Sequence, residues 1–178
     1  MEEFEDTTEK VREHMEHVAQ HSNDQWMFRV ALSSALLAVA AAITALVAGH
    51  HANEAMLEQI HASDAWAYYQ AKGIKWSILG AKMELLEAQG SESSKKDEEK
   101  RSEYKREQEE ISRDAKEKES VSAAHLKKHL IYARGVTLFQ VAIAIAAISV
   151  LTKKRRFWYG SLALGVLGLA FALQGFFA

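Results

Sequence analysis

The sequence predicts an all-α integral membrane protein with three transmembrane helices and a long extramembrane antiparallel helical hairpin between the first two of them. Three apolar runs are each about as long as the roughly 20 residues with which a helix crosses a bilayer. A strongly charged segment separates the first run from the second. No proline interrupts the helical patterns, so nothing in the composition forces a break in a long helix.

The pattern divides the chain into an N-terminal amphipathic segment, three spans, a hairpin and a basic turn. Their expected bounds are 1–25 for the N-terminal segment, 26–49 for the first transmembrane helix, 50–131 for the hairpin, 132–152 for the second transmembrane helix, 153–156 for the basic turn and 157–178 for the third transmembrane helix. Within the hairpin we expect a stalk at 50–89, a turn at 90–94 and a charged return arm at 95–131. Gly90 can end the stalk helix, and the serines after it can cap the next one.

The composition excludes several classes of protein. The 178 residues include 22 Lys and Arg against 24 Asp and Glu, a near-neutral balance that does not favour a nucleic-acid partner. There is no cysteine, which excludes disulfides, thiolate metal sites and a cysteine nucleophile. The sequence contains no phosphate-binding loop, dinucleotide-binding glycine pattern or nucleophile elbow. We therefore expect neither an enzymatic activity nor a bound cofactor.

Small residues recur along one face of each expected span, at alternating steps of four and three residues. In lipid, helices associate through close backbone contact, which small side chains permit, and heptad spacing favours a left-handed crossing near 20°. These faces can pack against the chain's own spans or against those of other copies. Because three spans seldom bury three such faces completely, we favour a homo-oligomer. The predicted helix-packing residues are Ala31, Ala35, Ala38, Ala42, Ala45, Gly49 and Ala52 in the first span, Gly135, Phe139, Ala142, Ala146 and Ser149 in the second, and Ser161, Gly165, Gly168, Ala172 and Gly175 in the third.

Aromatic residues and glycines share one face of the stalk. Trp66, Tyr69, Gly73, Trp76 and Gly80 follow one another at steps of three and four. Glycine weakens a helix by roughly 1 kcal/mol relative to alanine, so glycines beside bulky rings favour close packing against another helix. We expect this face to be the contact surface of the hairpin.

The return arm is very poor in apolar residues but is patterned as a helix. Asp97 with Arg101, Glu109 with Arg113, and Asp114 with Lys118 are favourable pairs four residues apart. These pairs indicate a solvated helix that returns along the stalk. A surface for binding a partner is the alternative interpretation of the same charges.

The basic turn at 153–156 predicts the orientation of the chain in the membrane. Its sequence, Lys-Lys-Arg-Arg, lies in a very short loop, where positive charge is the best indicator of the cytoplasmic side. We therefore expect the N-terminus and this turn to be cytoplasmic and the hairpin to be periplasmic. Lys127, Lys128 and Arg134 flank the second span on the opposite side and argue against this orientation.

Histidines and glutamates near the ends of the spans suggest a metal site. Glu58 and His61 form one copy of the Glu-x-x-His motif, which di-iron sites in helical bundles carry twice. The candidate ligands are His50, Glu54, Glu58, His61, His125 and His129. The alternative is that these are interfacial residues that bond to water. His14, His17 and His21 share a face of the N-terminal segment, on the other side of the membrane in this topology, and cannot join the site.

Residues 48–75, AGHHANEAMLEQIHASDAWAYYQAKGIK, resemble a bacterial membrane-protein family catalogued as domain of unknown function 4337. The alanine-rich span before this stretch, the charged middle of the chain and the two closing spans with a basic turn are also similar to the layout of that family. The resemblance implies a helical protein of the bacterial inner membrane. It implies no activity, cofactor or site residue.

The sequence therefore predicts a non-enzymatic membrane scaffold or docking protein. Its expected partners are the lipid bilayer and either further copies of itself or the other subunits of a membrane complex. Two alternatives remain, namely a metal-binding or ion-handling membrane protein that uses the His and Glu residues, and an accessory subunit of a larger membrane complex.

Overall fold

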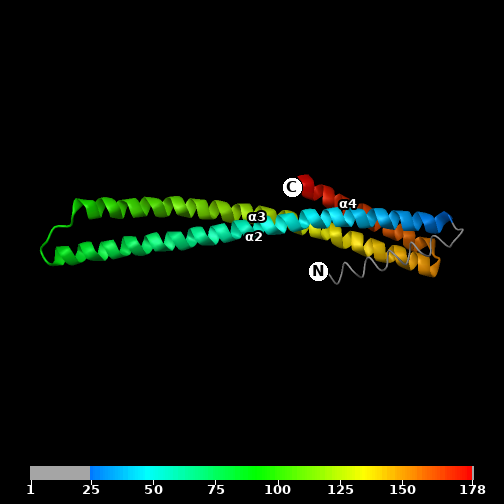
Figure 1. Cartoon of the computed structure of the whole chain (residues 1–178), viewed down its shortest axis with the longest axis horizontal. Helices are drawn as coiled ribbons and strands as arrows, with labels where there is room; N and C mark the ends of the chain where they lie inside the picture. The colour runs from blue at the N-terminus through cyan, green and yellow to red at the C-terminus, as the bar shows by residue number, and fades with distance from the viewer. Residues whose placement is uncertain (1–24, 178) are drawn as a thin grey trace. The chain divides into compact units, whose positions relative to one another are not determined.

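The computed structural model describes residues 25–177, which form three α-helices and no strand (Figure 1). Helix α2 runs from Gln25 to Ala88, α3 from Lys95 to Thr152, and α4 from Arg155 to Phe177. The predicted all-α fold is confirmed for this part of the chain. The amphipathic segment expected at 1–25 lies, apart from Gln25, outside the described residues.

The described residues divide into two compact units. The three-helix unit comprises residues 25–52 of α2, residues 126–152 of α3, and α4. The hairpin unit comprises residues 53–125, in which the second part of α2 and the first part of α3 run antiparallel. Each unit is described by itself below.

Gly90 ends helix α2 in the way that its residue type predicts. Its φ of 73° lies in the left-handed region, which glycine adopts without a steric penalty. The Gly90 N–H donates to the Glu87 carbonyl at 2.9 Å and the Ser91 N–H to the Leu86 carbonyl at 2.9 Å, so these two carbonyls of the last turn are satisfied. Helix α3 then begins at Lys95, with Asp97 and Glu98 in its first turn, where acidic side chains favour the positive end of a helix.

Each of the three helices contains a stretch that is long and apolar enough to cross a membrane. In α2 and α3 this stretch is only part of a helix of 64 and 58 residues, and in α4, with 23 residues, it is nearly the whole helix. The predicted spans are therefore helical and have the required length and composition.

In the three-helix unit, α3 and α4 approach closely enough for their backbones to meet. A Cβ atom added to Gly135 would lie 3.1 Å from the Gly168 carbonyl oxygen, and one added to Gly168 would lie 2.9 Å from Phe139 Cε1. At Gly175, an added Cβ would lie 2.7 Å from Cζ of Tyr132. Gly165 packs in the same way against Leu37 of α2, with 2.6 Å between the added Cβ and Cδ2. At Gly168 and Gly175 a methyl group would lie within 3 Å of an aromatic ring, so these contacts favour glycine.

The small residues predicted in α3 and α4 largely face other helices of the same chain. In α4, four of the five are buried, and Ala172 is half-buried. In α3, Gly135, Phe139, Ala142, Ala146 and Ser149 are all buried. Val30 of α2 joins Ala146 and Val150 in a buried cluster that Trp26 and Trp158 cover.

The small-residue face predicted in α2 is not the buried one. Ala31, Ala35 and Ala38 are half-buried, while Ala42, Ala45 and Gly49 are exposed. The buried face is shifted around the helix and consists of Met27, Val30, Ser34, Ala41, Thr44 and Ala48. Alanine occupies each position from Ala40 to Ala42, so small residues line adjacent faces of α2, and only contact with α3 and α4 selects one of them.

The basic turn is shorter than the sequence pattern suggests. Helix α3 ends at Thr152 and α4 already includes Arg155 and Arg156, so only Lys153 and Lys154 lie between the helices. Lys153 has a φ of 53°, a left-handed conformation that costs a non-glycine residue roughly 1–2 kcal/mol. The chain thus reverses its direction between α3 and α4 over two residues.

We predict that Gly168→Ala destabilises the protein by about 1–3 kcal/mol, the usual cost of overpacking a filled interface. The added methyl would press on the ring of Phe139, which is 1% exposed, and would lie 3.2 Å from the Gly135 carbonyl oxygen. Gly160→Ala is the matched control, because nothing lies within 4 Å of its added Cβ. Thermal unfolding of the full chain in detergent measures the difference. Equal stability of the two variants would show that close approach at Gly168 is not required.

Candidate functional site

Small side chains form one end of the contact between the helices of the hairpin unit. Ala55, Ala62 and Ala115 are buried, with exposed fractions of 7%, 0% and 0%. The Ser122 hydroxyl donates a 2.7 Å hydrogen bond to the Ala55 carbonyl across the pair. The helices are thus held together here by close approach and one polar link.

Towards the turn, the contact between the helices becomes polar. Lys72 of α2 is only 8% exposed, and its Nζ lies 2.6 Å from Oε2 of Glu107 on α3. The ammonium group also lies 5.1 Å from the ring centre of Tyr68 and 5.3 Å from that of Tyr104. The hydrogen bond to Glu107, and next that to Tyr68, raises the pKa of Lys72 above its ordinary value.

Further charged groups cross between the helices near the turn. The Arg101 guanidinium lies 4.2 Å from the ring centre of Trp76, and Lys82 pairs with Asp97 at 2.7 Å. The predicted partner of Asp97 was Arg101, one turn along the same helix, but the structure pairs each of the two with a residue of α2. A facing helix offers nearer partners than the solvent side of α3. The predicted pair of Asp114 and Lys118 is present at 3.7 Å.

The aromatic and glycine face of the stalk lies against α3. Trp66 Nε1 donates to Glu119 at 2.9 Å, and Gln108 Nε2 donates to the Tyr69 carbonyl at 3.3 Å. A Cβ atom added to Gly73 would lie 2.7 Å from Gln108 Nε2, and one added to Gly80 would lie 3.0 Å from Arg101 Nη2. The partner helix of this face is therefore the return arm of the same chain.

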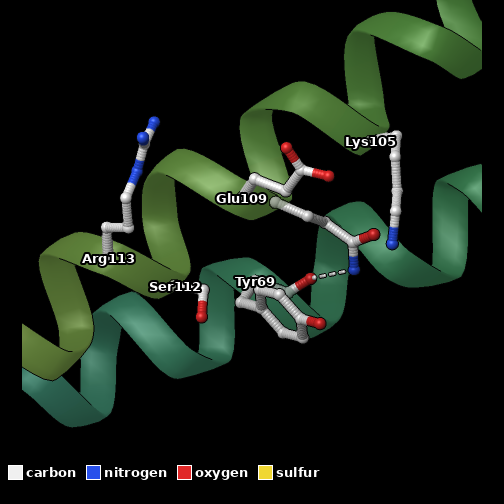
Figure 2. A pocket seen from close by; sticks show the side chains of 6 residues that line it. Tyr69, Lys105, Glu109, Ser112 and Arg113 are labelled. Carbon is white, nitrogen blue, oxygen red and sulfur yellow. Dashed lines mark hydrogen bonds between the residues drawn. The ribbon is translucent and has the colours of Figure 1, made fainter.

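An open depression lies beside this contact, between the backbone of α2 near Tyr69 and the side chains of α3 (Figure 2). Gln108, which lines the depression, donates from α3 to the Tyr69 carbonyl, and the Arg113 side chain extends away from α2. Lys105, Glu109 and Ser112 complete the lining. The depression brings together long charged side chains on a solvent-facing helix, an arrangement typical of a solvated surface.

The opposite face of α2 in the hairpin unit is apolar and uncovered. We call it the outer apolar stripe, and its residues follow one another at alternating steps of three and four. Its five aliphatic side chains are 47–65% exposed. In the part of α3 that belongs to this unit, Val121 is the one large apolar side chain with comparable exposure, at 38%. The stripe consists of Leu57, Ile60, Asp64, Ala67, Ala71, Ile74, Ile78, Ala81 and Leu85.

The sequence analysis identified the aromatic and glycine face of the stalk but did not identify this stripe. The available signal was that Ile74 and Ile78 cannot lie on the same side of a helix as Trp76 and Gly80, since two residues of helix correspond to about 200° of rotation. Within the hairpin unit, α3 covers one of these two apolar sides of α2 and leaves the other exposed.

The candidate metal ligands are distributed over both units. His50 and His129 belong to the three-helix unit, where His129 Nδ1–H donates to the Ala48 carbonyl at 2.8 Å and the ring of His50 lies 5.4 Å from that of His51. Glu54, Glu58, His61 and His125 belong to the hairpin unit. Within residues 25–177, no group of three or more His, Asp or Glu side chains is placed to hold a metal ion. The histidines at 14, 17 and 21 lie outside the described residues.

Comparison with known protein families identifies the family of the chain. Residues 26–178 match the family described as Domain of unknown function (DUF4337), and this match covers all three helices. The chain belongs to this family. The predicted resemblance is therefore confirmed over nearly the whole sequence. No curated protein and no solved structure matches the chain, so the DUF4337 assignment brings no activity, ligand or partner with it.

We predict that Lys72→Met lowers the melting temperature of the protein by several degrees, because Glu107 of α3 then faces α2 without a cation to pair with. Lys75→Met, which changes an exposed lysine one turn away, should leave it unchanged. Since the folded pKa of Lys72 is raised above 10.5, the stabilisation is fully present below 10.5 and is lost as the pH rises through the folded pKa.

Circular dichroism of the full chain at increasing pH tests both parts of this prediction. The difference in stability between wild type and Lys72→Met should be constant from neutral pH up to 10.5 and should disappear only above 10.5. A difference that disappears near neutral pH would show that another group is responsible.

Proposed function

We propose that the protein is a non-enzymatic scaffold of the bacterial inner membrane, which associates with further copies of itself through surfaces of α2 that its own helices leave uncovered. The observation that carries the proposal is the outer apolar stripe of the hairpin unit. The proposal assigns the three apolar stretches to the membrane and the hairpin unit to the aqueous side.

The surface of the three-helix unit supports a location in lipid. Large aliphatic and aromatic side chains point outwards, and Leu36, Ile43, Leu46, Val166 and Phe176 are each more than 60% exposed. In water such a surface would be a strong aggregation hazard, whereas in hydrocarbon it needs no cover. The charged side chains of the hairpin unit could not be placed in hydrocarbon without a large penalty.

The outer apolar stripe supports a second copy as the partner. Over residues 57–85 it extends about 40 Å along the helix, at a rise of 1.5 Å per residue. Copies in one membrane share their orientation, so two stripes meet in parallel and each aliphatic layer faces an identical one. Asp64 is the one charged residue of the stripe. A single polar residue in such a seam fixes the register at some cost in stability.

In the three-helix unit, the uncovered small residues of α2 support the same partner. The predicted packing residues of α3 and α4 are largely covered within the chain, but Ala42, Ala45 and Gly49 are exposed, and nothing lies within 4 Å of a Cβ added to Gly49. Small residues on a lipid-facing helix permit close approach of another helix. Among the three predicted small-residue faces, we therefore assign self-association to that of α2.

We predict that Ile74→Glu combined with Ile78→Glu weakens self-association at least about tenfold, since burial of an aliphatic side chain contributes about 1.5–3 kcal/mol. Asp64→Leu should strengthen it, because the like charges of two copies are removed. Energy transfer between donor- and acceptor-labelled full-length protein in vesicles measures association. Val121→Glu, which introduces one glutamate at an exposed apolar position of α3, is the control and should have no effect.

If the double variant associates like wild type, the stripe does not join copies. If it instead loses a different protein that co-purifies with wild type, the protein is an accessory subunit of a larger complex and the stripe is its docking surface for that complex.

We predict that Ser91→Cys, in the exposed turn of the hairpin, reacts with a membrane-impermeant maleimide in intact spheroplasts. Lys154→Cys, in the basic turn, should react only after permeabilisation. The chain has no native cysteine, so each variant reports one position. This pattern follows from a cytoplasmic basic turn and a periplasmic hairpin. The reverse labelling pattern would invert the proposed orientation.

A further inference from the structure

The described part of the three-helix unit contains positive charges and no carboxylate. Neither residues 25–52 nor residues 126–177 include an Asp or a Glu. The basic side chains of these ranges are Arg29, Lys127, Lys128, Arg134, Lys153, Lys154, Arg155 and Arg156. Within these ranges, therefore, no side-chain carboxylate is available to neutralise them.

Packing gathers five of these charges at one end of the unit. Because α3 reverses into α4 over two residues, Lys153, Lys154, Arg155 and Arg156 follow one another around a single turn, and all four are exposed. The Arg155 guanidinium lies 5.6 Å from the ring centre of Trp26, which brings the start of α2 to the same end. The exposed Arg29 lies one turn further along α2. We call these five residues the basic end.

Aromatic residues surround the basic end in an arrangement suited to the membrane surface. Trp158 Nε1 donates to the Ser33 hydroxyl at 3.1 Å, which fixes its ring between α4 and α2. The Tyr159 ring lies 5.2 Å from that of Trp158 and is 60% exposed. Leu151 and Phe157 are exposed beside the turn. Tryptophan and tyrosine favour the level of lipid headgroups, and the exposed apolar residues favour the adjoining acyl chains.

We propose that the basic end binds the headgroup phosphates of anionic phospholipids. This inference rests on the proposed membrane location. The cations supply charge-assisted hydrogen bonds to phosphate oxygens, and Arg155 and Arg156 can present two parallel donors each. A lipid is favoured over a free phosphate ion because the same end offers apolar and aromatic surface for the glycerol and acyl chains. Basic clusters beside a span attract anionic lipid with about 1 kcal/mol per residue, equivalent to roughly five-fold in affinity.

The test uses the full-length protein in nanodiscs that contain equal amounts of phosphatidylglycerol and phosphatidylcholine. Native mass spectrometry of the released protein gives the ratio of the two lipids that remain bound. We expect wild type to retain phosphatidylglycerol in preference, and Lys153→Gln with Lys154→Gln and Arg156→Gln to reduce the preference at least roughly five-fold. Lys127→Gln with Lys128→Gln is the matched control from the same unit and should retain most of the preference.

Three results would overturn the proposal. The first is an unchanged preference in the triple variant. The second is a wild-type protein without any preference, as expected if the eight acidic residues of 1–24 already neutralise the basic end. The third is loss of the preference on addition of inorganic phosphate, which would indicate a site for the free ion. Resistance to alkaline carbonate extraction is measured in parallel, so that failure to enter the membrane is distinguished from failure to select a lipid.

Discussion

The close approach of helix backbones is the constraint on which the three-helix unit depends. Between α3 and α4 the carbonyl of Gly168 faces Gly135, and Phe139 fills the space beside them. In the proposed lipid environment no hydrophobic force presses helices together, so the attraction would come from short-range contact over matched surfaces. A methyl group added at Gly135 or Gly168 would press on the backbone of the facing helix and remove such contacts. Glycine at 135 and 168 follows from this requirement.

In the hairpin unit, the two helices contact each other through different kinds of side chain. Its helices meet through alanines at one end and through charged and amide groups near the turn, where Lys72, Gln108 and Arg101 cross between them. A buried ion pair often contributes less to stability than apolar packing of the same volume, but removing one partner leaves an uncompensated buried charge. We infer that the polar contacts favour this register of α2 against α3. They also leave the apolar residues of α2 on its outer side.

The uncovered surfaces of the two units differ in the partner that they suit. The exposed aliphatic side chains of the three-helix unit suit hydrocarbon, and its five clustered cations suit phosphate. The outer apolar stripe of the hairpin unit, set beside a highly charged α3, suits another helix. None of these surfaces encloses a small molecule or assembles a nucleophile with a base. These broad surfaces are the basis of the scaffold function that we propose.

The sequence by itself determined the helices, their number in the described residues and the apolar stretches within them, because these depend on local propensity, length and composition. It also determined the end of α2, since Gly90 is the residue best suited to a left-handed φ. Only the tertiary structure decided which face of α2 is buried, because alanine lines adjacent faces at 40–42 and periodicity cannot choose between them. It likewise decided that Trp66, Tyr69 and Gly73 face the chain's own return arm while Ile74 and Ile78 remain uncovered. A sequence pattern gives the angular position of a side chain around its helix. Which segment packs against that side chain depends on contacts with a distant part of the chain.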